Sequence, residues 1–298
     1  MSKIACFWGS VGRPPSDSPG AAATGVRDVP TFCLNTFTFS PFAGAPKPVD
    51  FAELLDGVRA AGFEALSLDA FTLAAYREAG ASYEQLAAQV AAAGLTCPEM
   101  LGFVVAEDEA STLDGARQVA EAIAAFGASF ALGMVTIAPD ARCRDLFAGC
   151  AEIIAAAGGK AAVEFLPFSP VATVADARAL VRHAGTDRAG VLVDSWHVFH
   201  GPGSLDDVRA LPVAEFGYVQ LDDHPRALGP DADLYTECMT GRVMPGDGVF
   251  DLAAFRGAVE ATGFDGVVSV EVINPELAAA GPAAFAEAAM AAVRRVWS

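Results

Sequence analysis

Positive charge, histidine and long apolar runs are all scarce in this 298-residue sequence. It has 19 lysines and arginines against 37 aspartates and glutamates, a formal net charge of −18, and only four histidines. An acidic chain repels phosphate backbones and its basic residues are scattered, so we expect no nucleic-acid partner. No run of 18 apolar residues occurs. We therefore also expect no transmembrane helix and no membrane partner.

Cysteine pairs of the C-x-x-C type are absent, although the chain contains six cysteines. The first residues, MSKIACFWGSVG, lack the apolar core of a secretory signal peptide. These two absences favour reduced thiols and a cytoplasmic location. Residues 8–31 are rich in Gly, Pro, Ser and Asp. We therefore predict an irregular N-terminal arm over residues 1–31.

One pattern recurs from residue 32 onward. A helical stretch rich in Ala and Leu ends at a glycine, and a short apolar run follows, as in VRAAGFEALSLD (58–69) and VEATGFDGVVSVEV (259–272). The glycines stand where a helix needs a left-handed residue after its last turn. Short, β-branched apolar runs are typical of strands that are buried on both faces. The repeat therefore predicts alternating helices and parallel strands.

Eight such strands are predicted. They begin near residues 32, 65, 96, 129, 161, 189, 216 and 267. Eight alternating units close naturally into a barrel. A doubly wound sheet is the main alternative, but no G-x-G-x-x-G follows the first strand. We predict an α/β fold, a single-domain (β/α)8 TIM barrel over residues 32–298, with a functional loop at 224–248 after the seventh strand.

Four consecutive predicted strands each carry one polar residue among apolar neighbours: Glu164, Asp194, Gln220 and Glu271. Crowded carboxylates raise each other's pKa unless a counter-charge is present. A divalent metal ion supplies that charge, and oxygen ligands favour Mg²⁺, Mn²⁺ or Co²⁺ over Zn²⁺. The alternative for each residue is a loop cap or a pair with an arginine. Four such residues in register on consecutive strands favour a metal site, because the active sites of these barrels lie at the carboxyl ends of the strands.

Further candidates lie near these strand ends. His197 follows the sixth strand and is predicted to bind substrate or transfer protons. Arg242 lies in the long loop and suits a substrate oxyanion or carboxylate, with a loop-bracing salt bridge as the alternative. Three more substrate contacts are predicted: Asn35 in the first strand, Glu99 at the end of the third, and Trp196, for which a core position is the alternative.

These motifs resemble the xylose-isomerase-like barrels of the sugar phosphate isomerase/epimerase superfamily over residues 32–297. The resemblance is carried by VEFLP (163–167), VLVDSWH (191–197), VQLDD (219–223), RVMPGDG (242–248) and GFDGVVSVEV (263–272). It implies one divalent metal ion held by Glu164, Asp194, Gln220 and Glu271, and substrate contacts from His197 and Arg242.

The resemblance implies a metal-dependent isomerase or epimerase of a sugar, keto-sugar or polyol-derived substrate. A metal that polarises a carbonyl stabilises an enediolate, and Glu164 and Glu271 would serve as catalytic acid and base. One departure stands out: many family epimerases have a histidine where this chain has Gln220. The family's Gln-bearing members include dehydratases, so a dehydratase of the inosose or 3-dehydroshikimate type, with His197 as acid, is the alternative.

Two other classes fit the composition less well. An endonuclease-IV-like phosphodiesterase would use several metals, many histidines and a basic face, and this chain has four histidines and a charge of −18. A non-catalytic sugar-binding barrel would not need three convergent acids. We expect a small, carbohydrate-like substrate as the partner. The oligomeric state, including a homo-oligomer, stays open.

Overall fold

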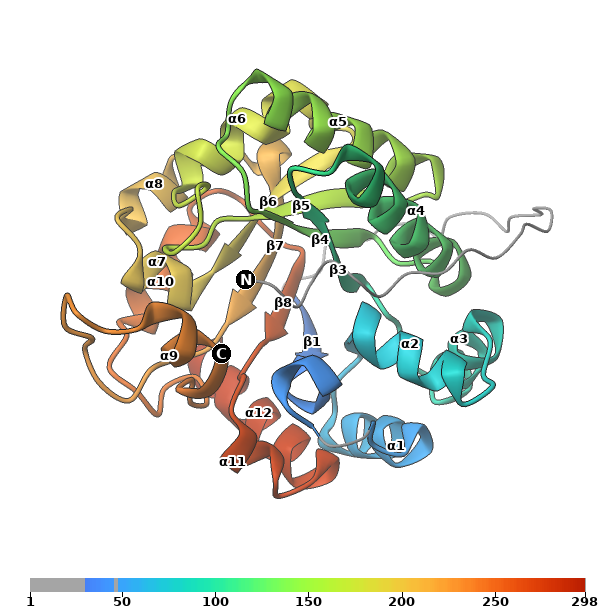
Figure 1. The fold of residues 1–298 in the computed structure, drawn as a ribbon. Helices are drawn as coiled ribbons and strands as arrows, with labels where there is room; N and C mark the ends of the chain where they lie inside the picture. The colour runs from blue at the N-terminus through green and yellow to red at the C-terminus, as the bar shows by residue number, and fades with distance from the viewer. Residues whose placement is uncertain (1–29, 46–47, 298) are drawn as a thin grey trace.

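Eight parallel strands close into a barrel with the helices outside it (Figure 1). The computed structural model describes residues 30–45 and 48–297. The strands are β1 (Thr31–Asn35), β2 (Ala65–Asp69), β3 (Glu99–Val105), β4 (Phe130–Val135), β5 (Lys160–Glu164), β6 (Ala189–Asp194), β7 (Phe216–Leu221) and β8 (Val267–Val270). The predicted TIM barrel is confirmed. Of the predicted N-terminal arm, residues 1–29 lie outside the described part.

The helices follow the strands in the expected alternation. They are α1 (Phe51–Ala61), α2 (Ala70–Glu78), α3 (Tyr83–Ala92), α4 (Glu109–Phe126), α5 (Ala141–Ala156), α6 (Val174–Ala184), α7 (Ser195–His200), α8 (Leu205–Arg209), α9 (Leu234–Thr240), α10 (Leu252–Glu260), α11 (Pro275–Ala278) and α12 (Pro282–Val296). Gly62 and Gly127 end α1 and α4 with φ of 91° and 65°, as predicted. Over residues 30–45 and 48–297, no helix is long and apolar enough to cross a membrane.

Two apolar clusters build the barrel. The larger one fills the space between the strands and the surrounding helices. The smaller one lies inside the barrel and contains Leu101, Leu132, Ala162, Leu192 and Tyr218. Successive side chains of a strand point to opposite faces. Strands β3 to β7 therefore contribute buried residues to both clusters.

The third strand is one place where the structure corrects the sequence prediction. We expected it to begin near residue 96, but Thr96 forms only an isolated bridge to Ala65, and β3 begins at Glu99. Pro98 has no N–H to donate to a ladder, and its carbonyl instead accepts from the amides of Ser129 and Phe130. Glu99 therefore opens this strand rather than ending it.

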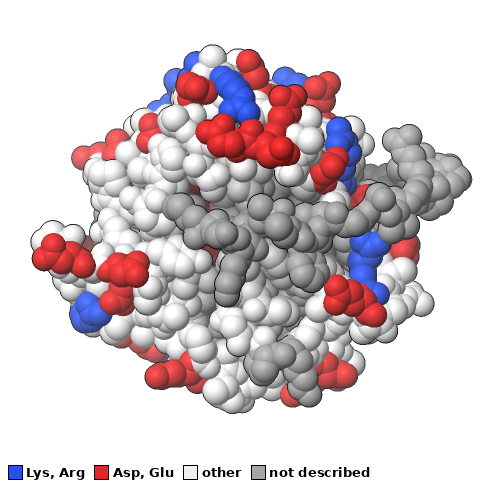
Figure 2. Space-filling view, viewed as in Figure 1, with Lys and Arg blue, Asp and Glu red and all other residues white. Residues whose placement is uncertain are grey.

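Charge on the face shown in Figure 2 is mixed. Lys and Arg side chains are scattered singly among Asp and Glu rather than gathered into one patch. The five described cysteines, Cys33, Cys97, Cys143, Cys150 and Cys238, are buried and free of disulfides.

Candidate metal and substrate site

The four predicted ligands lie together at the carboxyl ends of β5 to β8. Glu164 and Asp194 end their strands, Gln220 is the next-to-last residue of β7, and Glu271 directly follows β8. Asp194 and Gln220 are register partners in neighbouring strands. All four are buried, with exposed fractions of 6% or less. Strand period and register therefore bring them to one end of the barrel interior.

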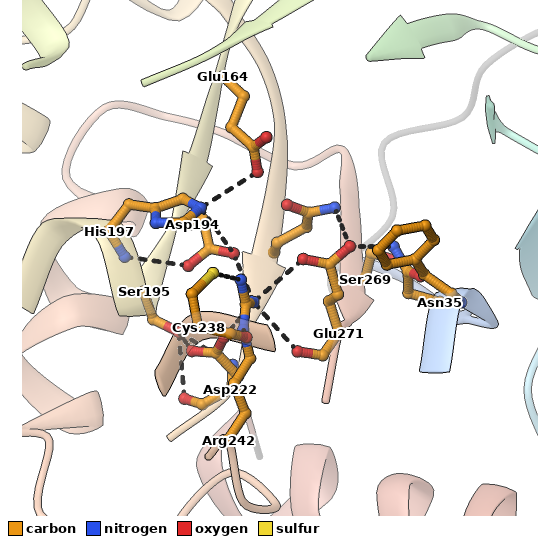
Figure 3. Close-up of polar contacts among 12 residues, drawn as sticks. Asn35, Glu164, Asp194, Ser195, His197, Asp222, Cys238, Arg242, Ser269 and Glu271 are labelled. Carbon is orange, nitrogen blue, oxygen red and sulfur yellow. Dashed lines mark hydrogen bonds and ion pairs between the residues drawn. The ribbon is translucent and has the colours of Figure 1, made fainter. Parts of the chain in front are cut away.

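A first group of metal-capable atoms comes from Glu164, Asp194 and His197. One ligand atom of each lies within 4.8 Å of the others. His197 Nε2 is 3.2 Å from Glu164 Oε1 and 3.9 Å from Asp194 Oδ2 (Figure 3). The structure thus adds a ring nitrogen to the oxygen donors of the predicted ligand set. His197 Nδ1 is buried and has no hydrogen-bond partner among the described residues.

A second group is centred on Glu271. Its Oε1 accepts from Asn35 Nδ2 at 2.8 Å and from Gln220 Nε2 at 3.1 Å. Asn35 Oδ1 accepts from the Phe37 amide, so both polar ends of Asn35 are engaged within the protein. Gln220 Oε1 is buried and has no hydrogen-bond partner within residues 30–45 and 48–297. An unpaired buried acceptor is costly, and a cation bound beside the carboxylates would satisfy it.

Arg242 lies between three carboxylates of this site. Its Nη1 donates to Asp194 Oδ2 and Glu271 Oε2, both at 3.0 Å, and also to Asp222 Oδ2 (Figure 3). Its other two nitrogens donate to Cys238, Nε to the carbonyl at 3.0 Å and Nη2 to the sulfur at 3.0 Å. The guanidinium is 1% exposed. The predicted substrate contact by Arg242 stays a prediction; in this state its donors all meet protein acceptors.

Asp222 is a site residue that the sequence analysis missed. It follows β7 and is fully buried, and its Oδ1 accepts from Ser195 Oγ at 2.7 Å. A signal for it existed, because the period of two along a strand places residue 222 on the same side as Gln220. The motif VQLDD therefore carries two inward polar residues rather than one.

Electrostatics at this site are unbalanced. Three buried carboxylates, Asp194, Asp222 and Glu271, share the Arg242 guanidinium, and a fourth, Glu164, contacts His197. With all four ionised and His197 neutral, the described part of the site carries three more negative charges than positive ones. Burial raises the pKa of Asp222 to about 7; the charge of Asp194 also raises it, and Arg242 lowers it. Burial likewise holds the pKa of Glu271 well above its ordinary value, against the effect of Arg242. The site has the electrostatics of a cation site that is short of positive charge.

Two other predicted substrate contacts, Trp196 and Glu99, are fully buried. Trp196 packs against His197 and Phe168, a core position as in the alternative, and its predicted contact with substrate stays a prediction. Glu99, predicted at a strand end, lies inside the barrel instead, where its Oε1 accepts from Ser269 Oγ and from Cys33 Sγ. The prediction that Glu99 ends its strand is wrong, because β3 starts at that residue.

The fold and the site together agree with the family comparison. A family model described as a xylose isomerase-like TIM barrel matches residues 55–295. The chain belongs to this family.

Two curated proteins and one solved structure are similar to this chain. A 3-dehydroshikimate dehydratase of Pseudomonas aeruginosa is 34% identical over 110 residues, 37% of this chain and 17% of that protein. An inosose isomerase of Bacillus velezensis is 34% identical over 116 residues, 37% of this chain and 38% of that protein. The matches thus span well under half of these curated relatives, both of which are enzymes. The structure of the IolI protein with a bound zinc atom has a TM-score of 0.78 at 19% identity, covering 90% of this chain and 98% of that one.

Proposed function

We propose that this protein is a divalent-metal-dependent isomerase or epimerase that moves a proton on a small hydroxylated ketone through an enediolate. The observation that carries the proposal is the pair of Glu164 and His197 in a buried site with too little positive charge. Such a pair can take up and return a proton. The relative named as an inosose isomerase supports the same reaction class.

The residues that would hold the ion are Glu164, Asp194, Gln220 and Glu271, with His197 as a further donor. The uncompensated carboxylates and the unpaired Gln220 oxygen fit such a group. A bound divalent ion would polarise the substrate carbonyl and stabilise the negative charge that develops on its oxygen. Oxygen donors favour Mg²⁺, Mn²⁺ or Co²⁺, whereas the nearby imidazole also suits Zn²⁺.

The two glutamates differ in how firmly they are held. Glu271 accepts from Asn35, Gln220 and Arg242, which engage both of its oxygens. In the part of the chain that the structure describes, the Glu164 carboxylate has a hydrogen bond with His197 alone. We assign proton removal to Glu164, because its carboxylate has fewer hydrogen bonds to give up before it can turn toward a substrate proton. Glu271 would return a proton from the other side when the reaction inverts a centre.

A dehydratase is the second candidate, and the contact between His197 and Glu164 fits this reaction as well. Elimination needs a base for the C–H proton and an acid for the leaving hydroxyl, and this pair offers both within 3.2 Å. The relative named as a 3-dehydroshikimate dehydratase points the same way. Inosose and 3-dehydroshikimate are both hydroxylated cyclic ketones, so one substrate class serves both proposals.

The test is incubation of the purified protein with ketoses, ketoinositols and 3-dehydroshikimate in D₂O, with and without Mn²⁺. Isomerisation is expected to give a new isomer with deuterium on the carbon beside the carbonyl. Loss of one water mass would identify a dehydratase. Absence of both from the whole panel in the Mn²⁺-loaded protein would contradict the proposal.

A further inference from the structure

Arg242 bonds to the same carboxylates that are proposed to hold the metal ion. Its Nη1 lies 3.0 Å from Asp194 Oδ2 and 3.0 Å from Glu271 Oε2. A guanidinium keeps its positive charge at every pH that a folded protein survives. A positive charge this close to two ligand oxygens opposes a second cation on them, and burial leaves little water to screen the repulsion.

Arg242 also has partners that are not proposed ligands. Asp222 accepts from its Nη1, and Ser195 Oγ donates to the other oxygen of Asp222. Cys238 accepts from both remaining nitrogens, through its carbonyl and its sulfur. Burial raises the pKa of the Cys238 thiol to about 12, so the sulfur accepts as a neutral thiol. Arg242 therefore keeps a counter-ion and an anchor when Asp194 and Glu271 are engaged elsewhere.

Cys238, which accepts two hydrogen bonds from Arg242, lies in α9 in the long loop after β7. The preceding residue, Glu237, is bound by His224 Nε2 at 3.2 Å and by Arg226. Tyr235 of the same helix packs edge-on against Phe168, with ring centroids 5.7 Å apart. These contacts fix α9 against the barrel end, and through Cys238 they fix the guanidinium. The position of this loop is thereby coupled to the charge within the site.

We propose that Arg242 is an internal cation that competes with the divalent ion for Asp194 and Glu271, while Asp222 and Cys238 retain it. The inference rests on the proposed metal site. Its consequence is a metal that binds more weakly and exchanges more readily than the same ligands would allow without the arginine.

The test is calorimetric titration of the full chain with Mn²⁺ alone. Arg242→Met keeps a stem of similar length without the charge and should tighten the Mn²⁺ Kd at least about tenfold. Arg242→Lys keeps the charge but loses the hydrogen bonds of Nε and Nη2 to Cys238 that hold it beside Asp194 and Glu271, so about threefold tightening is expected. Arg178→Met is the matched control: it removes the same charge from a partly buried ion pair with Glu215, outside the site, and should leave the Kd within twofold.

The outcomes separate this inference from the proposed function. Wild-type binding with an unchanged or weaker Kd in Arg242→Met overturns the competition and leaves the metal site standing. No binding in either protein overturns both. Binding only in Arg242→Met supports the competition and contradicts a metal-loaded wild type. If Arg242→Met does not fold, the titration of Arg242→Lys decides whether the inference holds. An unchanged or weaker Mn²⁺ Kd in that variant overturns it.

Discussion

Replacement of Glu164 by glutamine tests the proposed division of labour in the site. Glutamine keeps the shape and one oxygen ligand but removes the basic carboxylate. The variant also replaces a carboxylate that lies 3.2 Å from His197 Nε2 at a buried position. If Glu164 removes the substrate proton, its loss should slow turnover and deuterium incorporation together.

The expected loss is about 10²–10⁴-fold in kcat, the usual contribution of a positioned general base. That range equals about 3–5 kcal/mol of transition-state stabilisation. The change also removes one of the charges that would hold the ion, so weaker metal binding could mimic the effect. The assay must therefore run at saturating Mn²⁺ with the bound metal measured in each sample.

Glu271→Gln is the matched comparison, because it removes the same charge from a carboxylate that three donors hold. A loss confined to Glu164→Gln indicates one base, and equal losses indicate a two-base epimerisation. Full turnover by metal-loaded Glu164→Gln would refute the assignment. His197 would then become the leading base and elimination the favoured reaction.

Three further predictions concern pH, packing and partners. Burial raises the pKa of Glu99 from 4.5 to about 7. Its protonated form is therefore favoured in the folded state, and stability should fall by on the order of 3 kcal/mol as the pH rises from about 4.5 to about 7. Glu99→Gln should remove that slope in urea unfolding curves, and an unchanged slope would exclude this residue as its source. Gly190→Ala should lower the free energy of unfolding by about 1–3 kcal/mol, because its Cβ would lie 2.8 Å from Gly217 Cα. Gly257→Ala is the control and should cost none, because a Cβ there would meet open space. Equal effects of the two substitutions would contradict the packing argument. No salt-sensitive binding to a DNA duplex with an abasic site is expected from a chain of charge −18, and such binding in a mobility-shift titration would favour the phosphodiesterase alternative.

Periodicity explains how much of this site was predictable from sequence. A polar residue within a short apolar strand must point into the barrel or into the surrounding helices, and Glu164, Asp194 and Gln220 do so at neighbouring strand ends. The same periodicity predicts that Asp222 points inward only if the alternation is extended past Leu221, the last residue of β7. Glu99 was misplaced because Pro98 interrupts the pairing just before it, which no apolar pattern reveals.

The partners of Arg242 were beyond sequence reasoning for a different reason. The residue lies 48 positions from Asp194 and 29 from Glu271 in the chain. The sequence analysis predicted that Arg242 contacts substrate or forms a loop-bracing salt bridge. The structure places its guanidinium between three carboxylates. Local patterns predict which face a side chain takes. They do not predict which residue of a distant loop contacts that side chain.

The central claim is that Glu164, Asp194 and Glu271, together with Gln220, hold one divalent ion. Measuring the metal content and the thermal stability of the protein tests this claim most directly. The protein loaded with Mn²⁺ and freed of excess should retain about one ion per chain by elemental analysis. Exhaustive chelation should lower the Tm by several degrees, because an ion present at about 100 times its Kd stabilises the folded state by about 2.7 kcal/mol. Retention of no ion, together with a Tm that chelator and Mn²⁺ leave unchanged, would contradict the account.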